Sequence, residues 1–573
     1  MSDRKIGVYI CYCGGNISDY VECEKVRDAI EHEEGVVVAK TTMFACSDAA
    51  QQEMIDDIQE QKLDAMVVAS CSPTLHLFTF RGVAERAGLN PYLYVQVNLR
   101  EQCSWTHTDV PDQATKKAVH LVKAGIAKAR LTEPLEKTRI ETVPRALVVG
   151  AGISGLRAAL ALSDLGISVF IAEKTDKIGG WVAEMGRMYP HDRRGSELIA
   201  DLVAEIEKRE NIQIYKQAEL TEKAGSVGDF NVKLNVKGES VPLNVGSIIV
   251  TTGFNSYEPA DGEYAYGTEG VLTLPEFKQL LDKSEGELTY QGKPVKTVSY
   301  IYCVGSRGSS AKENPNTYCS RYCCNAAMHA SSVAHDLSPK LHQFHLFRDI
   351  RTYGKFEELY REARQKNAVF IKFEDDDPPK VEKSNGRFTI QVKDVLTFGE
   401  ELDIQSDLVV LVTAMEPRPN QPLNDVLKLP IGLDGFFKEI HPKLRPVETV
   451  IDGVFIAGTA QAPRNSAESV ASALAATSKS ASLLKKGFVE LEPLIALVDK
   501  EACTWCDKCV ESCPYSAIEK VSHAGKEVAE VSAALCKGCG CCVPACPQGA
   551  LGVKGFTDQQ IRAMIDAMEV RNG

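Results

Sequence analysis

The stretch Arg145–Trp181, RALVVGAGISGLRAALALSDLGISVFIAEKTDKIGGW, predicts the fold of the middle of the chain. An apolar strand at 146–149 runs into Gly150, Gly152 and Gly155, and a helix rich in Ala and Leu follows. These glycines allow a tight turn, close approach of the backbone to a diphosphate, and close packing of helix on strand. The diphosphate would rest on the amides and the positive dipole end of that helix. The stretch therefore predicts a dinucleotide-binding α/β domain; a glycine-rich turn in an α/β core is the alternative.

The end of this stretch indicates which dinucleotide is bound. A second strand at 169–171 ends at Glu173, whose carboxylate would accept a hydrogen bond from a ribose hydroxyl. Lys174 and the pair Gly179–Gly180 follow, and this order resembles the flavoprotein form of the fold, so FAD is favoured over NAD. The residues predicted here to contact the cofactor are Gly150, Ala151, Gly152, Ser154, Gly155, Glu173, Lys174, Gly180 and Trp181.

Composition limits the classes of function. The 573 residues suffice for three or four domains, and 44% hydrophobic with 25% charged residues is typical of ordinary soluble protein. The net charge of -13 argues against nucleic acid or an anionic membrane as the principal partner. With no apolar span of about 18 residues and a polar MSDRK start, a cytoplasmic protein is expected. In a reducing compartment, 19 cysteines indicate metal ligation or redox chemistry.

Residues 1–131 predict a small parallel α/β domain, because short apolar strands alternate with helical segments. Loops after successive parallel strands meet at one edge of the sheet, so thiols in these loops can converge. Such a set suits a cubane iron–sulfur cluster or a tetrahedral zinc, with scattered buried cysteines as the alternative. Cys11 and Cys13 both follow the first strand, and Cys13 is chosen; Cys23 is expected to be structural. The predicted ligands are Cys13, Cys46, Cys71 and Cys103.

The dinucleotide-binding domain is predicted to be split in sequence. A linker at 132–144 precedes its first part, 145–271, and its closing part is 446–490. IIVTTGF (Ile248–Phe254) and VFIAGTAQAPRNSAESVASALAAT (Val454–Thr477) look like the segments that approach the flavin in two-dinucleotide flavoproteins. The further cofactor contacts predicted from them are Thr252, Gly253, Gly458 and Ala467.

The inserted second half, 272–445, lacks a glycine fingerprint of its own. Its strand VSYIYCVGSR ends near Cys303, and YCSRYCC follows. Four thiols therefore replace a phosphate cradle, so we predict a cluster near the flavin and no NAD(P)H site; thiols without metal are the alternative. The predicted ligands are Cys303, Cys319, Cys323 and Cys324. His329, expected on the following helix, could reach the flavin edge and is a tentative catalytic residue; a solvated or core-bonded histidine is the alternative.

Two cysteine runs lie in the last predicted domain, 491–573. Each has the spacing C-x2-C-x2-C-x3-C-P, which is typical of two-cluster ferredoxins in which the fourth cysteine of each run ligates the other cluster. One cluster should use Cys503, Cys506, Cys509 and Cys546. The other should use Cys536, Cys539, Cys542 and Cys513. Zinc is the alternative metal.

Several segments spread over nearly the whole chain carry a family resemblance. They are YICYCGGNI, VVASCSPTLH, LNPYLYVQVNLREQCSW, GAGISG, YCVGSR, YCSRYCC, GTAQAP and the paired ferredoxin runs. Through them the chain resembles the HdrA family, the flavin and iron–sulfur subunits of heterodisulfide reductase. The resemblance implies FAD in a thioredoxin-reductase-like core, and [4Fe-4S] clusters in the N-terminal, core and C-terminal parts, four in all with the ligand sets above.

The same resemblance implies partners. It indicates assembly with an electron-donor subunit, ferredoxin and other subunits of a heterodisulfide-reductase-like complex that reduce a disulfide or similar acceptor. A homodimer within a larger assembly is a further expectation.

Electron bifurcation by the flavin, known in some relatives, is left open. Bifurcating members often carry an additional ferredoxin-like module, whereas this chain has only a short hairpin-like stretch between Phe230 and Ser247. Relatives also tend to have a lysine at the position of His329. We therefore predict an oxidoreductase subunit that relays electrons through FAD and iron–sulfur clusters. The alternatives are a flavin disulfide reductase that uses Cys323 and Cys324 as a dithiol, and a docking subunit with a structural flavin.

Overall fold

The computed structural model describes residues 4–308 and 316–568 of the chain. These residues form two compact units. Unit 1 combines residues 1–139 with 490–573, and unit 2 is the continuous segment 140–489. The N-terminal segment and the ferredoxin-like segment thus belong to one unit, although more than 300 residues separate them in sequence. The finer domain limits given above stay predictions.

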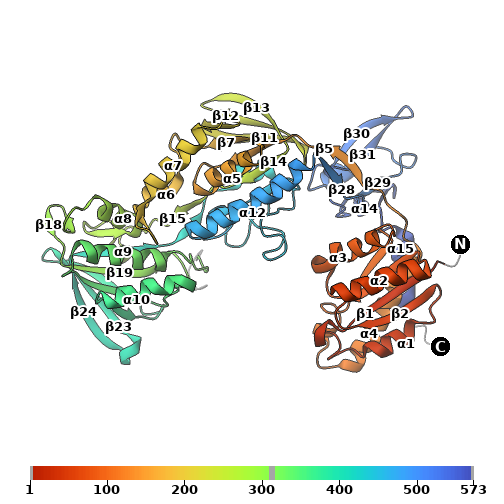
Figure 1. Ribbon diagram of the computed structural model, residues 1–573, viewed down its shortest axis with the longest axis horizontal. Helices are drawn as coiled ribbons and strands as arrows, with labels where there is room; N and C mark the ends of the chain where they lie inside the picture. Colours follow the sequence, from red (N-terminus) through yellow and green to blue (C-terminus); the bar gives the residue numbers. More distant parts are fainter. Residues whose placement is uncertain (1–3, 309–315, 569–573) are drawn as a thin grey trace. The chain divides into compact units, whose positions relative to one another are not determined.

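The N-terminal part of unit 1 is a four-stranded parallel sheet in the order β2-β1-β3-β4. Its central strands β1 and β3 are completely buried, as the continuous apolar runs predict for a parallel sheet. Helices cover both faces, and Figure 1 shows them around the red strands. The strands are β1 (Ile6–Cys11), β2 (Val36–Thr42), β3 (Ala65–Ser70) and β4 (Tyr94–Asn98). The helices are α1 (Cys23–Ile30), α2 (Asp48–Gln61), α3 (Pro73–Arg86) and α4 (Pro111–Arg130).

The C-terminal part of unit 1 is a pseudo-symmetric repeat of strand, cysteine run and strand. Two antiparallel pairs, β29 with β32 and β30 with β31, flank two one-turn helices. Helix α15 (Asp558–Met568) follows and packs on α4, and the Gln560 side-chain amide donates to the Leu131 carbonyl at 2.8 Å. The elements are β29 (Ala496–Val498), α13 (Lys508–Glu511), β30 (Ile518–His523), β31 (Lys526–Val531), α14 (Cys542–Ala545) and β32 (Leu551–Val553).

Unit 2 contains two five-stranded parallel sheets. The first has the order β10-β7-β6-β14-β27, and α5 (Ile153–Asp164) and α12 (Ser466–Lys485) lie side by side on it (Figure 1). Its last strand comes from the end of the unit, so this domain is indeed split in sequence. The strands are β6 (Arg145–Val149), β7 (Ser168–Glu173), β10 (Ile212–Lys216), β14 (Ser247–Val250) and β27 (Val454–Ile456). The stretch after residue 229 forms the antiparallel pair β12 (Asp229–Val236) and β13 (Glu239–Val245).

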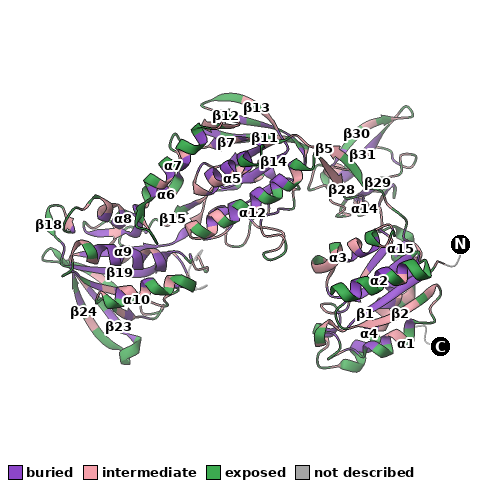
Figure 2. Cartoon of the chain, in the orientation of Figure 1, coloured by how far each residue is buried: buried purple, intermediate pink, exposed green. Residues whose placement is uncertain are grey.

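The second sheet has the order β16-β25-β19-β20-β21, and all its pairs are parallel. Helix α9 (Cys323–Leu337) and helix α8 (Leu274–Lys283) pack on it, and Figure 2 shows α9 in the buried colour over most of its length. The two parallel sheets confirm the predicted α/β fold with two dinucleotide-binding-like halves. The strands are β16 (Val271–Thr273), β19 (Thr297–Val304), β20 (His342–Phe347), β21 (Val369–Lys372) and β25 (Leu408–Thr413).

Among the described residues, none of the helices combines the length and the apolar character needed to cross a bilayer.

Candidate functional site

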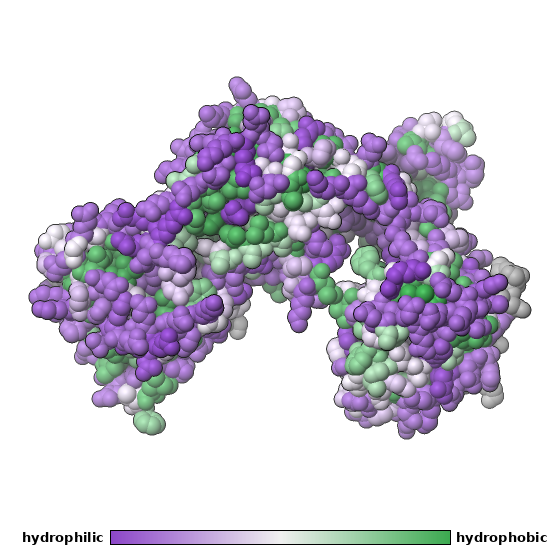
Figure 3. Space-filling model, in the orientation of Figure 1, coloured by the Kyte–Doolittle hydropathy of each residue, from purple (hydrophilic) through white to green (hydrophobic). Residues whose placement is uncertain are grey.

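A cavity of about 1690 Å³ lies in unit 2 along the first parallel sheet. Typical ligand pockets have about 300–1,000 Å³, so this cavity has room for a whole dinucleotide. Figure 3 shows hydrophobic atoms in the region where Figure 1 draws α12 and β15 (Phe254–Ser256), in agreement with apolar lining residues such as Ile153, Ile178 and Trp181. Of the predicted cofactor contacts, the lining includes Gly150, Gly152, Ser154, Glu173, Lys174, Gly180, Trp181, Thr252, Gly253 and Ala467.

The glycine loop at the start of α5 has the shape that a diphosphate needs. A Cβ on Gly155 would lie 1.9 Å from the Gly150 carbonyl oxygen, so only glycine allows the helix to approach the strand here. A Cβ on Gly152 would meet no protein atom within 4 Å, so that backbone faces open space in the cavity. Gly152 is also the residue that begins the helix, where unpaired amides favour an anion.

Three predicted contacts lie behind this surface. Ala151 is buried, and its amide donates to the Glu173 carboxylate at 2.8 Å. Gly458 adopts φ +68°, and a Cβ there would lie 2.4 Å from Ser154 Oγ, so it allows α5 and the closing segment to pack closely. With Gly155, these residues shape the cavity from behind rather than lining it.

Orphaned polar atoms support a polar cofactor in this cavity. Thr252 Oγ1, the Tyr322 hydroxyl and both amide atoms of Asn325 are buried without a hydrogen-bond partner among the described residues. All three residues line the cavity. A buried polar group without a partner costs about 1–3 kcal/mol, so these groups fit the ribityl and ring edges of a flavin dinucleotide. Trp181 packs on Phe254 with ring centroids 5.7 Å apart, and together they supply an apolar surface.

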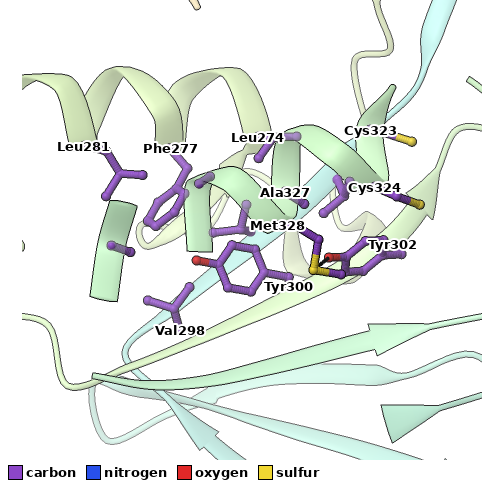
Figure 4. Close-up of a cluster of buried hydrophobic side chains, with 14 of the residues drawn as sticks. Leu274, Phe277, Leu281, Val298, Tyr300, Tyr302, Cys323, Cys324, Ala327 and Met328 are labelled. Atoms are coloured by element: carbon purple, nitrogen blue, oxygen red, sulfur yellow. Dashed lines mark hydrogen bonds between the residues drawn. The ribbon is translucent and has the colours of Figure 1, made fainter. Parts of the chain in front are cut away.

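The core thiols lie directly beside the cavity. Cys323 and Cys324 open α9, between the lining residues Tyr322 and Asn325, and Figure 4 shows both side chains directed away from the apolar core around Tyr300 and Phe277. The two thiols are hydrogen-bonded to each other, which raises the pKa of Cys323 and lowers that of Cys324. Both the Cys303 and the Cys319 thiols lie close enough to Cys323 to affect its pKa. The structure thus brings the four predicted ligands together.

Cys303 is held in an unusual backbone conformation with cationic neighbours. Its φ of +62° lies in the left-handed region, which costs about 1–3 kcal/mol for such a residue and is frequent at functional sites. Burial raises the pKa of the Cys303 thiol, and the nearby Arg348 and Arg307 act in the opposite direction. Arg348 donates to the carbonyls of Ser306 and Arg307, so it fixes the loop that carries the thiol. Arg307 Nη1 is 3.8 Å from Cys303 Sγ.

In the ferredoxin part, four predicted ligands line one small cavity: Cys503, Cys506, Cys509 and Cys546. Backbone amides donate to the sulfur atoms in matched pairs. Ala529 N donates to Cys503 Sγ and Ala496 N to Cys536 Sγ, both at 3.4 Å. Ala517 N to Cys513 Sγ (3.4 Å) and Ala550 N to Cys546 Sγ (3.3 Å) form the second pair. Amides directed at sulfur stabilise cluster thiolates, so these residues fit two cubanes.

The remaining four ferredoxin thiols surround the second predicted position. Burial raises the pKa of Cys542 to about 11, and the thiols of Cys536, Cys513 and Cys539 add to this rise. Cys541, left over in the sequence, is exposed and lies outside the cavity that the other set lines. Within the described residues, no group of three or more side chains converges tightly enough for a single metal ion, which is a different geometry from ligands around a cubane.

The N-terminal thiols form a different group from the predicted one. Burial raises the pKa of Cys71 to about 11, and the thiols of Cys13 and Cys11 add to this rise. Burial also raises the pKa of Cys11, and Cys13 and Cys46 add to it in the same way. Cys103 is fully buried and donates to the Ala114 carbonyl at 3.0 Å, with no thiol among the causes of its raised pKa. The structure thus brings Cys11, Cys13, Cys46 and Cys71 together and leaves Cys103 in the core against α4.

Cys13 resembles Cys303 in its surroundings. Its φ is +55°, and Arg100 Nη1 donates to Cys13 Sγ at 3.5 Å. Arg100 itself pairs with Glu101 at 2.7 Å and lies over the Trp105 ring. Cys23 is buried at the start of α1 and close to the Val21 carbonyl, as expected for a structural residue.

Several residues of the site carry no local sequence signal. Tyr322 and Asn325 could have been inferred only from their position beside the thiols, and Arg307 and Arg348 only from the loop they hold. Lys278, on α8, lines the cavity, and burial lowers its pKa to about 8. His329 lines it too, with its Nε2 atom 2.7 Å from Asp192 Oδ1. Long-range packing creates these neighbours, and one strand or helix pattern contains no information about it.

Comparisons with known proteins agree with these observations. Residues 496–553 match the family described as a 4Fe-4S dicluster domain, and residues 148–203 match an NAD(P)-binding Rossmann-like domain. The chain also aligns with a thioredoxin reductase structure from T. acidophilum, at 19% identity and a TM-score of 0.41, over 60% of this chain and 99% of that one.

Curated relatives cover almost the whole chain. An A-type iron-sulfur subunit of CoB–CoM heterodisulfide reductase from Methanopyrus kandleri is 36% identical, over 92% of both chains. The A-type iron-sulfur subunit of Methanocaldococcus jannaschii is 33% identical over 99% of both. The A-type subunit of the H(2):CoB-CoM heterodisulfide,ferredoxin reductase of Methanothermobacter thermautotrophicus is 35% identical over 92% of this chain and 93% of its own. The chain, an oxidoreductase subunit with a 4Fe-4S dicluster domain, belongs to the HdrA family of heterodisulfide reductase subunits.

Proposed function

We propose that this chain is the FAD-containing electron-transfer subunit of a heterodisulfide-reductase-like complex, with four [4Fe-4S] clusters. The observation that carries the proposal is the shared wall of the cavity: Gly152 of the glycine loop lines it, and so do Tyr322 and Asn325, which flank two of the core thiols. FAD takes up two electrons and releases them singly, and cubanes carry one at a time. The site residues predicted above hold the FAD and the clusters.

The N-terminal cluster would be held by four of five thiols. The grouping in the structure supports Cys11, Cys13, Cys46 and Cys71, with Cys103 as the alternative fourth ligand from the sequence prediction. The core cluster would use Cys303, Cys319, Cys323 and Cys324, next to the FAD. The ferredoxin clusters would exchange electrons with a donor subunit or ferredoxin, and a disulfide-type acceptor would be reduced by a further subunit. Bifurcation and a homodimer within the assembly are finer proposals that follow from the family alone.

A pair of glycine variants tests the FAD site. Gly152→Ala adds a methyl group that meets no protein atom within 4 Å, so the melting temperature of the FAD-free chain should be unchanged. The same methyl group would occupy the diphosphate position, so we expect at least a tenfold loss of FAD affinity, which corresponds to about 1.4 kcal/mol. Unchanged affinity in Gly152→Ala would contradict the proposed site. Gly155→Ala is the matched comparison: its Cβ would lie 1.9 Å from a carbonyl oxygen, and it should destabilise the FAD-free chain itself.

The hydrogen bond between Cys323 and Cys324 favours a second candidate, a dithiol that the flavin reduces. In that case the chain would act as a flavin disulfide reductase, and no iron would be bound in unit 2. Iron analysis of Cys303→Ser separates the two: a cluster requires this ligand, whereas a dithiol does not. Loss of about four irons per chain supports the electron-transfer subunit, and unchanged iron supports the dithiol.

A further inference from the structure

A histidine and a carboxylate connect the cavity of unit 2 with solvent. His329 lies on α9 and lines the cavity, and its side chain is only 8% exposed. Its Nε2 atom is 2.7 Å from Oδ1 of Asp192, whose side chain is 51% exposed. For the Nδ1 atom no hydrogen bond is present within residues 4–308 and 316–568, so this nitrogen is available to a molecule in the cavity.

The backbone around Asp192 is shaped to present this carboxylate. Asp192 has φ +52°, a left-handed conformation that aspartate tolerates better than most residues. Tyr189 packs edge-on against the His329 ring, with centroids 6.1 Å apart, and also lines the cavity. The imidazole is therefore fixed from two sides, with one nitrogen on a surface carboxylate and its other side towards the cavity.

Charged groups on every neighbouring element act on His329. Burial is the largest effect and lowers its pKa, and Lys278 of α8 lowers it further. Asp192, and more weakly Glu362 of helix α10 (Glu357–Gln365), act in the opposite direction. Lys278 is itself buried, donates to the Arg187 carbonyl at 2.8 Å, and is influenced by Asp192 and Asp282. His329 is thus mainly neutral at pH 7 and becomes protonated as the pH falls.

We propose that Asp192 and His329 form a proton relay from solvent to the flavin held in the cavity. The inference rests on the proposed function, because it needs FAD at that site. Two-electron reduction of the flavin takes up at least one proton, with the electrons supplied by the iron–sulfur clusters or a chemical reductant. The proton leaves Nδ1 of the protonated imidazole and forms a bond to the flavin. A replacement from solvent passes through the Asp192 carboxylate to Nε2. Relays of this kind place the histidine as general acid and the carboxylate as its positioning residue.

The test measures flavin reduction by dithionite in the anaerobic full chain between pH 5.5 and 8.5, alongside the midpoint potential of bound FAD at each pH. Wild type should be reduced faster as the pH falls, and its potential should show a break at the pKa of His329. His329→Gln keeps a hydrogen-bonding side chain but cannot carry a proton. It should slow reduction at least tenfold at pH 6, abolish both pH effects, and recover part of the rate when imidazole is added.

Two variants should move the break in opposite directions. Asp192→Asn removes the charge that raises the pKa of His329, so the break moves to lower pH. Lys278→Met removes a charge that lowers it, so the break moves to higher pH. His523→Gln is the matched control, since this exposed histidine in unit 1 lies 3.9 Å from Glu501 and does not line the cavity. It should leave rate and potential unchanged.

Each remaining outcome decides against the relay. A His329→Gln chain with wild-type rate and pH profile would overturn it. A His329→Gln chain that no longer binds FAD would also overturn it, because the histidine would then be a binding residue. A wild-type chain that binds no FAD after reconstitution would instead overturn the proposed function, and this result is visible before any variant is made.

Discussion

The ferredoxin repeat and the core thiol group reach sulfur ligation by different routes. In the repeat, three ligands of each cluster lie within seven residues, and backbone amides such as those of Ala517 and Ala550 donate to the sulfur atoms. In the core, the thiols come from the end of β19 and the start of α9, and arginine side chains provide the positive charge. The repeat is a local motif, whereas the core group exists only when unit 2 is folded.

The largest effect should come from ligand loss, and it should separate the two regions. Cys324→Ser should remove about four irons and leave the ferredoxin spectrum unchanged, because only the core group loses a ligand. Cys509→Ser should remove about four irons from the repeat and spare the core. Iron analysis with EPR spectroscopy checks both variants.

Cys541→Ser is the control for this pair, since Cys541 is exposed and lies next to the predicted ligand Cys542. It should retain all iron. If Cys541→Ser loses iron and Cys542→Ser does not, the register of the second run is wrong. If Cys324→Ser changes the ferredoxin spectrum, the two regions are not independent.

A smaller effect concerns the stability of the fold that carries the core thiols. His345, on β20, is fully buried, and burial lowers its pKa to about 3. Since the ordinary pKa of the unfolded chain is about 6.5, the unfolded state binds the proton first, and unit 2 loses stability as the pH falls below 6.5. From pH 7.5 to 5.0 the loss due to His345 should be about 2 kcal/mol, and His345→Gln should remove it.

Unfolding of the full chain in urea, followed by Trp181 fluorescence in a chain with Trp105→Phe and Trp505→Phe, measures this difference. His342→Gln is the matched control, because His342 lies on the same strand but is exposed. A His345→Gln chain with the same acid sensitivity as wild type would show that this histidine is not the cause. No comparable buried histidine is present in the described part of the ferredoxin repeat, where His523 is partly exposed.

The smallest effect should be a shift in the reduction potential of the core cluster. Arg307 Nη1 lies 3.8 Å from Cys303 Sγ and also pairs with Asp349. Arg307→Gln removes a positive charge near the cluster, so reduction becomes less favourable and the core potential should fall. Redox titration monitored by EPR should show this fall together with unchanged ferredoxin potentials. A shift of all clusters would contradict the local assignment of this arginine.

The same comparison explains what could be predicted from sequence. The ferredoxin ligands follow from spacing, because the chain wraps around each cluster within one turn. The glycine loop is equally local, and the fold class and the family are confirmed. Cys303, Cys319, Cys323 and Cys324 could be grouped from sequence because a single loop connects them, and the structure brings them together; their role as ligands stays a prediction.

Where four separate loops supply the thiols, the register was harder to predict. Cys103 follows the fourth strand as expected, but its thiol points into the core and donates to Ala114. Cys11, the last residue of β1, takes a place in the group instead. Which face a loop side chain takes depends on packing against α4, and no strand pattern contains that information. For the same reason Asp192 and Lys278 had no sequence signal, although both act on His329.

The central claim is a path of metal centres through one flavin, and cofactor content tests it most directly. Iron, sulfide and FAD should be measured in the full chain after purification without oxygen. Four cubanes and one flavin predict about sixteen irons, about sixteen sulfides and one FAD per chain. About eight irons, all retained in Cys303→Ser and Cys71→Ser variants, would confine the clusters to the ferredoxin repeat and contradict the account.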